Sequence, residues 1–207
     1  MMITVNNLQF KPFIAASEIQ ERVNALGAEL RQRYEGKHPL FIGILNGAFI
    51  FTADLVRSAG LECEVTFMRL SSYAGLQSSG QVITNMGLDI DIKDRHVILV
   101  EDIIDSGRTL YELAKKMREQ GPASVAIATL LLKPDALQFP LEADFVGFSI
   151  PSKFVIGYGL DYNQAGRELP EIFQLAEWWY FPRNAQHNAP THPNPHPNPH
   201  PILWIFQ

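Results

Sequence analysis

Several features that would narrow the function of this chain are scarce or absent in its sequence. Cys63 is the single cysteine in 207 residues, so an intramolecular disulfide is excluded and a reducing compartment is favoured. The 17 basic residues are outnumbered by 22 acidic ones, and a net charge of −5 gives no basic surface for nucleic acid. Neither a secretory signal nor a membrane-spanning run is visible. We therefore expect a cytoplasmic protein that binds neither nucleic acid nor membrane.

Hydrophobic residues make up 46% of the chain, which is enough for the core of one domain of mixed α/β type. Apolar and amphipathic segments alternate, as in βα units around a parallel sheet. Residues 1–10 are typical of an edge strand. The sequence predicts further strands at 40–45, 64–70, 97–100, 125–132, 145–150 and 155–157, and helices at 17–35, from Ala48 to Gly60, and from Thr109 to Gly121.

The most informative stretch is 97–110, in which four aliphatic residues are followed by three carboxylates and Ser-Gly-Arg-Thr. The pattern predicts a buried strand, a turn and a helix. Backbone N–H groups at a helix start lack helical partners, so a turn of this kind can bind a phosphate. Capping of the helix by Asp105 or Ser106 would explain one of these residues, but not Glu101 and Asp102. A phosphorylated sugar is the ligand that this pattern indicates.

This stretch resembles the phosphoribosyl-pyrophosphate (PRPP) binding motif of the type I phosphoribosyltransferases. Residues 144–148 and 153–163 resemble the branch of that family that uses hypoxanthine and guanine. The resemblance implies the α/β fold of that family, with a central, mainly parallel sheet flanked by helices and a small hood built from the chain ends. It also implies transfer of 5-phosphoribose from PRPP to N9 of a 6-oxopurine, Mg²⁺ as cofactor, and a homodimer or homotetramer.

The resemblance implies roles for the residues that would handle the sugar and its phosphates. Glu101 and Asp102 would face ribose hydroxyls and, with Asp161, hold magnesium. Asp105 would move the purine proton as general acid and base. The 5-phosphate would bind to Ser106, Gly107, Arg108 and Thr109, and the pyrophosphate to Asn46, Gly47 and Arg167, with a cis peptide between Leu45 and Asn46.

The resemblance also implies a purine site and a lid. Lys133 would donate to the purine 6-oxo group, and Phe154 would stack on the ring. Val155 would offer backbone groups to the edge of the purine, and Asp161 would also belong to the purine-binding residues. Ser72 and Tyr73, in a Ser- and Gly-rich loop, would fold over the reacting centre and exclude water.

Each of these residues has an ordinary structural alternative. Lysines beyond strands are usually solvated, Phe154 fits a core, Asp161 fits a turn and Arg167 fits a surface. Two functional alternatives also stay open. One is a phosphoribosyltransferase for xanthine or another base, because selectivity depends on a few groups near the purine 2-position. The other is a PRPP- or nucleotide-sensing regulatory protein of the same fold.

The resemblance covers residues 8–173, and the remainder is of another kind. We expect a phosphoribosyltransferase domain over 1–182 and a disordered tail over 183–207, because its repeated His-Pro-Asn-Pro units suit neither a helix nor a central strand. His192, His196 and His200 recur every four residues, but closing a metal site on a flexible chain costs considerable entropy.

Overall fold

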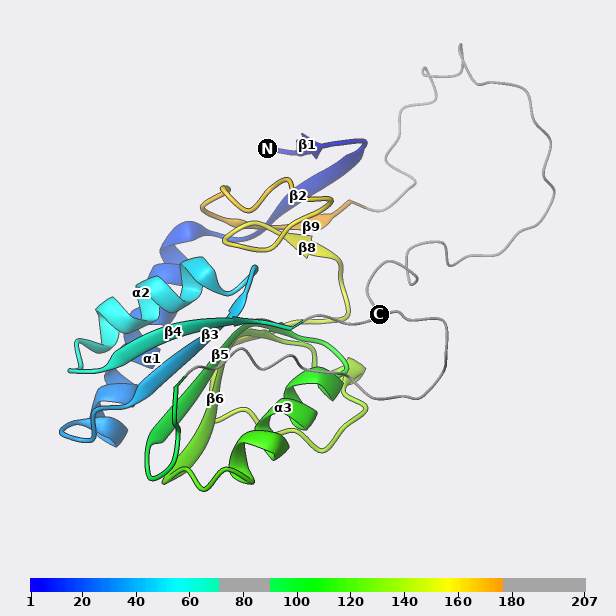
Figure 1. Cartoon of the computed structure of the whole chain (residues 1–207). Helices are drawn as coiled ribbons and strands as arrows, with labels where there is room; N and C mark the ends of the chain where they lie inside the picture. Colours follow the sequence, from blue (N-terminus) through cyan, green and yellow to red (C-terminus); the bar gives the residue numbers. More distant parts are fainter. Residues whose placement is uncertain (71–89, 177–207) are drawn as a thin grey trace, which may run out of the picture. The chain divides into compact units, whose positions relative to one another are not determined.

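The computed structural model describes residues 1–70 and 90–176. Met1–Leu175 form one compact unit, and a second unit begins at Ala176. The expected boundary between domain and tail at 182/183, the tail itself and the expected lid residues Ser72 and Tyr73 lie outside the described residues. Figure 1 shows the strands and helices of the first unit in colour.

A five-stranded parallel sheet forms the centre of this unit (Figure 1). Its strands lie in the order β4 (Glu64–Arg69), β3 (Leu40–Leu45), β5 (His96–Ile104), β6 (Ser124–Leu132) and β7 (Phe145–Ser149). Alternate residues of β5 point to opposite faces: Val97 and Leu99 join one core, and Ile98 and Val100 the other. Because both faces are covered here, residues 97–100 are aliphatic without interruption.

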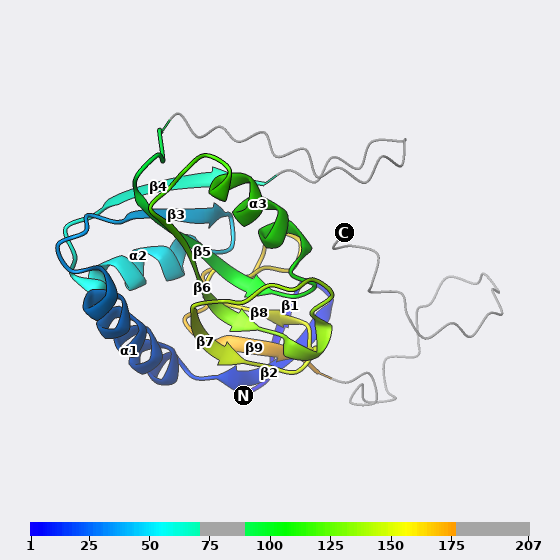
Figure 2. The same cartoon turned by 90° about the horizontal axis from the view of Figure 1, so that it is seen from below.

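Three helices cover the two faces of this sheet. Figures 1 and 2 show α1 (Ala16–Tyr34) and α2 (Phe49–Ala59) on one side and α3 (Arg108–Arg118) on the other. In α3 the residues at spacings of three and four, Leu110, Leu113, Ala114 and Met117, are buried as the pattern predicts. No helix within 1–70 or 90–176 has the length and hydropathy needed to cross a membrane.

A small antiparallel sheet forms the hood, at the top of the view in Figure 1. Its strands lie in the order β1 (Ile3–Val5), β2 (Leu8–Ile14), β9 (Ile172–Leu175) and β8 (Val155–Ile156). It has a core of its own that contains Phe10, Ile156 and Phe173. The expected architecture of a mainly parallel sheet, flanking helices and a hood from the chain ends is confirmed.

Three expectations about individual strands were wrong. Residues 1–10 form a hairpin rather than one strand, because the chain turns at Asn6, which takes a left-handed conformation (φ 52°) that asparagine tolerates. Strand β9 was not predicted, and it pairs with both β2 and β8. Strand β5 does not end at Val100 but continues through Glu101 and Asp102, because its pairing with β6 runs on to Ile104.

Candidate active site

The polar residues singled out in the sequence gather at the carboxyl ends of the parallel strands. Leu45, which ends β3, lies opposite Arg69 of β4, and Ile104, which ends β5, lies opposite Leu132 of β6. Asn46, Asp105 and Lys133 therefore follow strand ends at the same edge of the sheet. Open α/β sheets bind ligands beyond this edge, so the topology alone predicts a site here.

Two neighbouring acidic residues, Glu101 and Asp102, lie near the carboxyl end of β5. The carboxylate of Asp102 accepts a hydrogen bond from the Ile103 N–H (2.8 Å), and that of Glu101 accepts one from the Asp102 N–H (3.2 Å). Burial, and then the adjacent Asp102 carboxyl, raise the pKa of Glu101 well above its ordinary value. An acidic pair in this setting is stabilised by a bound cation or by hydroxyl donors.

Asp105 and Lys133 form an ion pair across the ends of β5 and β6. Lys133 Nζ donates to Asp105 Oδ2 at 2.7 Å, and the Lys133 N–H donates to the Ile104 carbonyl at 2.9 Å. The Lys133 side chain is only 12% exposed, whereas that of Asp105 is 60% exposed. Lys133 is therefore not a solvated surface lysine. The pair combines a proton acceptor with a hydrogen-bond donor at the edge of the site.

The Ser106–Thr109 turn leads directly into α3, as predicted. Gly107 has a φ of 77°, which favours glycine, and α3 begins at Arg108. The Arg108 N–H lies 3.5 Å from Ser106 Oγ, a long hydrogen bond. The first backbone N–H groups of the helix, with its positive dipole end, face away from the helix body and suit an anion.

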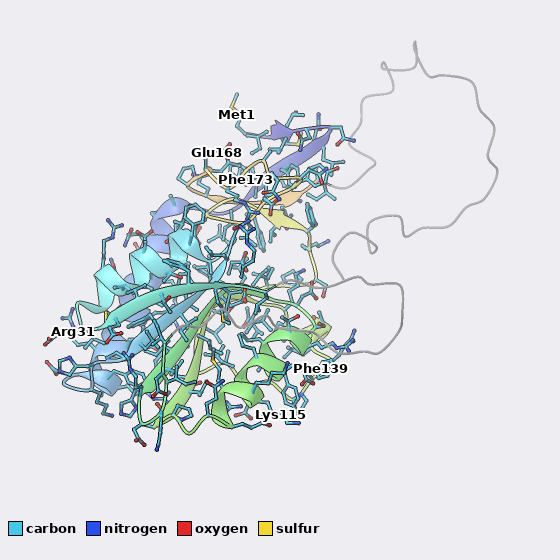
Figure 3. All side chains as sticks on the ribbon, in the orientation of Figure 1. Met1, Arg31, Lys115, Phe139, Glu168 and Phe173 are labelled. Atoms are coloured by element: carbon cyan, nitrogen blue, oxygen red, sulfur yellow. The ribbon has the colours of Figure 1, made fainter. Side chains whose placement is uncertain are left out.

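A segment that follows β6 covers this turn. It begins with a single turn of 3₁₀-helix, η1 (Pro134–Ala136), and the Gln138 N–H then donates to the Ser106 carbonyl at 3.0 Å. Leu137 packs on Gly107, because a Cβ at that glycine would lie 3.1 Å from Leu137 Cδ2. The ring of Phe139, labelled in Figure 3, lies 5.7 Å from that of Tyr111 in α3. The residues after Lys133 thus hold the candidate phosphate turn in place.

The turn between β3 and α2 is enclosed on two sides. The Leu45–Asn46 peptide is cis, as the resemblance implied. Gly47 is buried, and a Cβ there would lie 1.5 Å from Asp102 Oδ2, so a larger residue would require the Asp102 side chain or the turn to move. On the other side, a Cβ at Gly159 would lie 2.1 Å from the Gly47 carbonyl oxygen. The turn is therefore in contact with both the acidic pair and the hood.

The hood brings Arg167 and Asp161 together. Arg167 Nη1 donates to the Gly159 carbonyl (2.7 Å), and its Nη2 pairs with Asp161 Oδ1 (2.7 Å). The other Asp161 oxygen accepts from the Gln164 N–H at 2.7 Å. Both side chains of the pair are 20% exposed. Since Gly159 also contacts Gly47, the Arg167–Asp161 pair lies close to the β3–α2 turn.

Val155 begins β8 in the hood, and Phe154 directly precedes it. The Phe154 ring lies 6.1 Å from that of Phe10 and 5.9 Å, edge to face, from that of Tyr162. Val155 is buried in β8, where it pairs with Gln174. Phe154 is thus braced by aromatic neighbours and only partly buried, which leaves open the stacking that the resemblance implies.

The hood is also tied to α2 through Tyr158. Its hydroxyl donates to Asp54 Oδ2 at 2.6 Å, and Asp54 also pairs with Arg57. Burial, together with the Asp54 carboxylate, raises the pKa of Tyr158 far above its ordinary value. Since Tyr158 precedes Gly159, this contact helps to fix the hood against the β3–α2 turn.

The structure brings most of the predicted residues to one edge, but it does not build a metal cage from protein groups alone. Within the two described stretches, no group of three or more histidine, cysteine or acidic side chains could hold a metal ion. Three features were not predicted from the sequence. Arg69 Nη2 donates to Asn46 Oδ1 at 2.9 Å, and Tyr158 contacts Asp54. The third feature is the segment 137–141, which follows β6 and covers the Ser106–Thr109 turn. Only the position of Arg69 at the carboxyl end of a strand could have drawn attention to it.

Comparisons with known proteins agree with this geometry. Residues 15–163 match the family model described as a phosphoribosyl transferase domain. The chain is 46% identical, over 171 residues, to a hypoxanthine-guanine phosphoribosyltransferase of Streptococcus pneumoniae, with 82% of this chain and 95% of the relative covered.

Solved structures give the same result. A hypoxanthine-guanine phosphoribosyltransferase of Bacillus anthracis superposes with a TM-score of 0.75 at 35% identity, over 80% of this chain and 98% of that one. A hypoxanthine phosphoribosyltransferase of Trypanosoma cruzi, studied for the role of its C-terminal region in oligomeric state and activity, gives 0.75 at 34% identity, over 84% and 95%. This chain therefore belongs to the phosphoribosyltransferase family, in the group that contains the hypoxanthine-guanine enzymes.

Proposed function

We propose that this protein is a purine salvage enzyme that transfers 5-phosphoribose from PRPP to N9 of hypoxanthine, and also of guanine, releasing pyrophosphate. The observation that carries the proposal is one sheet edge on which the turn at the start of α3, an acidic pair and the Asp105–Lys133 pair are neighbours. The reactants are metabolites of the cytoplasm, which is where we expect the enzyme to act.

The 5-phosphate of PRPP binds at the turn from Ser106 to Thr109, through backbone N–H groups and the two hydroxyls. The Arg108 side chain adds positive charge at the start of α3. Glu101 and Asp102 then face the ribose hydroxyls. As pyrophosphate leaves, the sugar carbon gains positive charge, and the two carboxylates stabilise this cation electrostatically.

Lys133 and Asp105 act on the base. The Lys133 ammonium, which can only donate, binds the purine 6-oxo group, and the Asp105 carboxylate exchanges a proton with the ring near N7. Phe154 stacks on the purine, and the backbone at Val155 meets its edge. Because the ion pair already holds both side chains at the strand ends, little reorganisation is needed when the base arrives.

The pyrophosphate binds between the β3–α2 turn and the hood, at Asn46, Gly47 and Arg167. Glu101 and Asp102 near the end of β5, and separately Asp161 in the hood, are the residues that would hold Mg²⁺, since the three form no single cluster among the described residues. Each position offers one or two carboxylates, and magnesium is usually held by that number together with substrate oxygens and water. When bound, the ion neutralises charge on the departing pyrophosphate. Ser72 and Tyr73 are proposed to close over the reacting centre.

We also propose a homodimer or homotetramer. Strand β4 is an edge of the parallel sheet, and it exposes Val65 and Phe67 to 44% and 41%. Phe49, at the start of the neighbouring α2, is 42% exposed. Large apolar side chains grouped at a sheet edge favour association with a second copy. Light scattering during gel filtration tests this, and a monomer at micromolar concentration would contradict it.

An assay of pyrophosphate release with PRPP, Mg²⁺ and each of hypoxanthine, guanine, xanthine and adenine tests the proposed reaction. We expect turnover with hypoxanthine and guanine and none with adenine, whose 6-amino group offers no acceptor to Lys133. Turnover with xanthine alone would show that the reaction type is right but that the base is xanthine. Binding of PRPP without turnover of any base would favour the regulatory alternative and contradict the proposal.

A further inference from the structure

Arg69, which the proposed function leaves without a task, lies beside the β3–α2 turn. It is the last residue of β4 and lies opposite Leu45, directly before the cis peptide. Met68 is buried and Arg69 is exposed, so the alternation of the strand turns the two side chains to opposite faces. Arg69 therefore lies on the same face as Phe67, whose ring packs against Gly43 near α2.

The contact that holds Arg69 leaves its charge at the turn. Its Nη2 donates to the Asn46 amide oxygen at 2.9 Å. This acceptor is neutral, unlike the carboxylates that face Arg33, Arg95 and Arg167. A guanidinium has five N–H donors in one plane, and the bond to Asn46 uses one of them. The contact thus orients a positively charged fork without neutralising it.

A second guanidinium approaches the same turn from the hood. Arg167 donates to the Gly159 carbonyl, and Gly159 is packed against the Gly47 carbonyl. Arg69 and Arg167 therefore flank the β3–α2 turn from β4 and from the hood. Planar guanidinium groups bind phosphate oxygens bidentately, and two of them match an anion with two phosphate groups.

We propose that Arg69 is a diphosphate-binding residue that contacts the pyrophosphate group of PRPP and the released pyrophosphate. This inference rests on the proposed function, because it assumes that the diphosphate lies at the β3–α2 turn. Asn46 then has the task of aiming the Arg69 guanidinium, rather than of binding the anion through a charge of its own.

Two substitutions separate charge from geometry. Arg69→Gln removes the charge but keeps an N–H donor for Asn46, and Arg69→Lys keeps the charge on a different donor. Affinities of the full chain for pyrophosphate with Mg²⁺, and separately for IMP, are measured by calorimetry. We expect Arg69→Gln to weaken pyrophosphate binding by about ten-fold or more, as loss of a charge-assisted hydrogen bond predicts. Arg69→Lys should weaken it by a smaller factor, because it keeps the charge but loses the bidentate fork. IMP has no diphosphate, so its affinity should stay the same.

Arg95→Gln is the matched control. Arg95, directly before β5, pairs at 3.0 Å with Glu64, the first residue of β4, so this change removes the same charge beside the opposite end of β4. It should leave pyrophosphate affinity unchanged. Unchanged affinity in Arg69→Gln, or equal losses in the Gln and Lys variants, would overturn the inference.

Binding of IMP and of pyrophosphate by the wild-type protein separates a failure of the Arg69 role from a failure of the proposed function. If it binds IMP but not pyrophosphate, the role of Arg69 is wrong while the nucleotide site stands. If it binds neither compound, the proposed function itself fails, and the inference fails with it.

Discussion

At the scale of single residues, the chemistry depends on which side chains meet at the strand ends. Asp105, Lys133 and Gly47 could be named as candidates from the sequence and from the family resemblance, and their roles stay predictions. Their contacts could not, because strand register decides that Lys133 meets Asp105 and that Gly47 lies against Asp102. Arg69 was missed for the same reason: its partner Asn46 is 23 residues away in the sequence and adjacent only through the pairing of β3 and β4.

Replacement of Asp105 by asparagine tests the proton transfer. The variant keeps the size of the side chain but loses the carboxylate, so kcat should fall by a factor on the order of 10² to 10⁴, while PRPP affinity stays largely intact. Single-turnover kinetics and PRPP titration provide the two readouts. Asp135→Asn, which changes an exposed carboxylate in η1, serves as control. An unimpaired rate in Asp105→Asn would remove this residue from its role.

Replacement of Gly47 by alanine tests the enclosure of the β3–α2 turn. The new Cβ would lie 1.5 Å from Asp102 Oδ2, so the turn or the acid must move, at a cost of about 1–3 kcal/mol of unfolding free energy. The KM for PRPP should rise with it. Gly36→Ala is the control, because that position has open space and a φ of 71°. It should cost about 1 kcal/mol and leave the KM unchanged; equal kinetic effects in both variants would argue against a special role for Gly47.

At the scale of elements, strands and helices with a clear apolar pattern were predictable, as were the short strands β7 and β8, whereas the β1–β2 hairpin and β9 were not. Strands β3 and β4 and helices α1 and α3 follow their apolar patterns closely. Strand β9 has only four residues and is stabilised by partners from both ends of the domain, so no local pattern marks it. The length of β5 depends on its pairing with β6, which is likewise not a local property.

The segment after β6 is expected to position the phosphate turn. Phe139→Ala removes the packing on Tyr111, which should let Leu137 and Gln138 loosen their hold on Ser106 and Gly107. The KM for PRPP should rise by about two- to ten-fold, the equivalent of one aromatic pair, with little change in kcat. Phe139→Leu should restore most of the loss. A KM at the wild-type value in the alanine variant would show that this segment has no such role.

Tyr158 gives a pH-dependent test of how the hood is attached. Tyr158→Phe should lower the unfolding free energy by about 1 kcal/mol through loss of the bond to Asp54. The raised pKa keeps the folded phenol protonated at a pH where the unfolded phenol ionises, so its contribution is complete below about pH 10 and is lost as the pH rises further. In urea titrations the difference between wild type and variant should shrink above that pH. A difference independent of pH would contradict the stabilising role of the Tyr158–Asp54 hydrogen bond.

At the scale of the whole molecule, the described candidate residues all lie within the compact unit Met1–Leu175. The chain beyond it differs in composition, with repeated His-Pro-Asn-Pro units that the sequence alone separates from the domain. The resemblance over 8–173 predicted the architecture of this unit because that segment contains every strand of the parallel sheet.

Deletion of residues 187–207 tests whether the unit is sufficient. We expect the kcat and both KM values of the shortened chain to match those of the full chain, because the proposed site draws only on residues before 168. Steady-state assays on both proteins, with light scattering to compare their oligomeric state, check this. A large loss of turnover would show that the tail contributes to the site or to its assembly.

The most direct test of the account is the stoichiometry of the reaction. With PRPP, Mg²⁺ and hypoxanthine, IMP and pyrophosphate should accumulate in a one-to-one ratio, and neither should form when the base is omitted. Pyrophosphate release without IMP, or release of free ribose 5-phosphate in its place, would contradict the claim that this sheet edge joins a purine to phosphoribose.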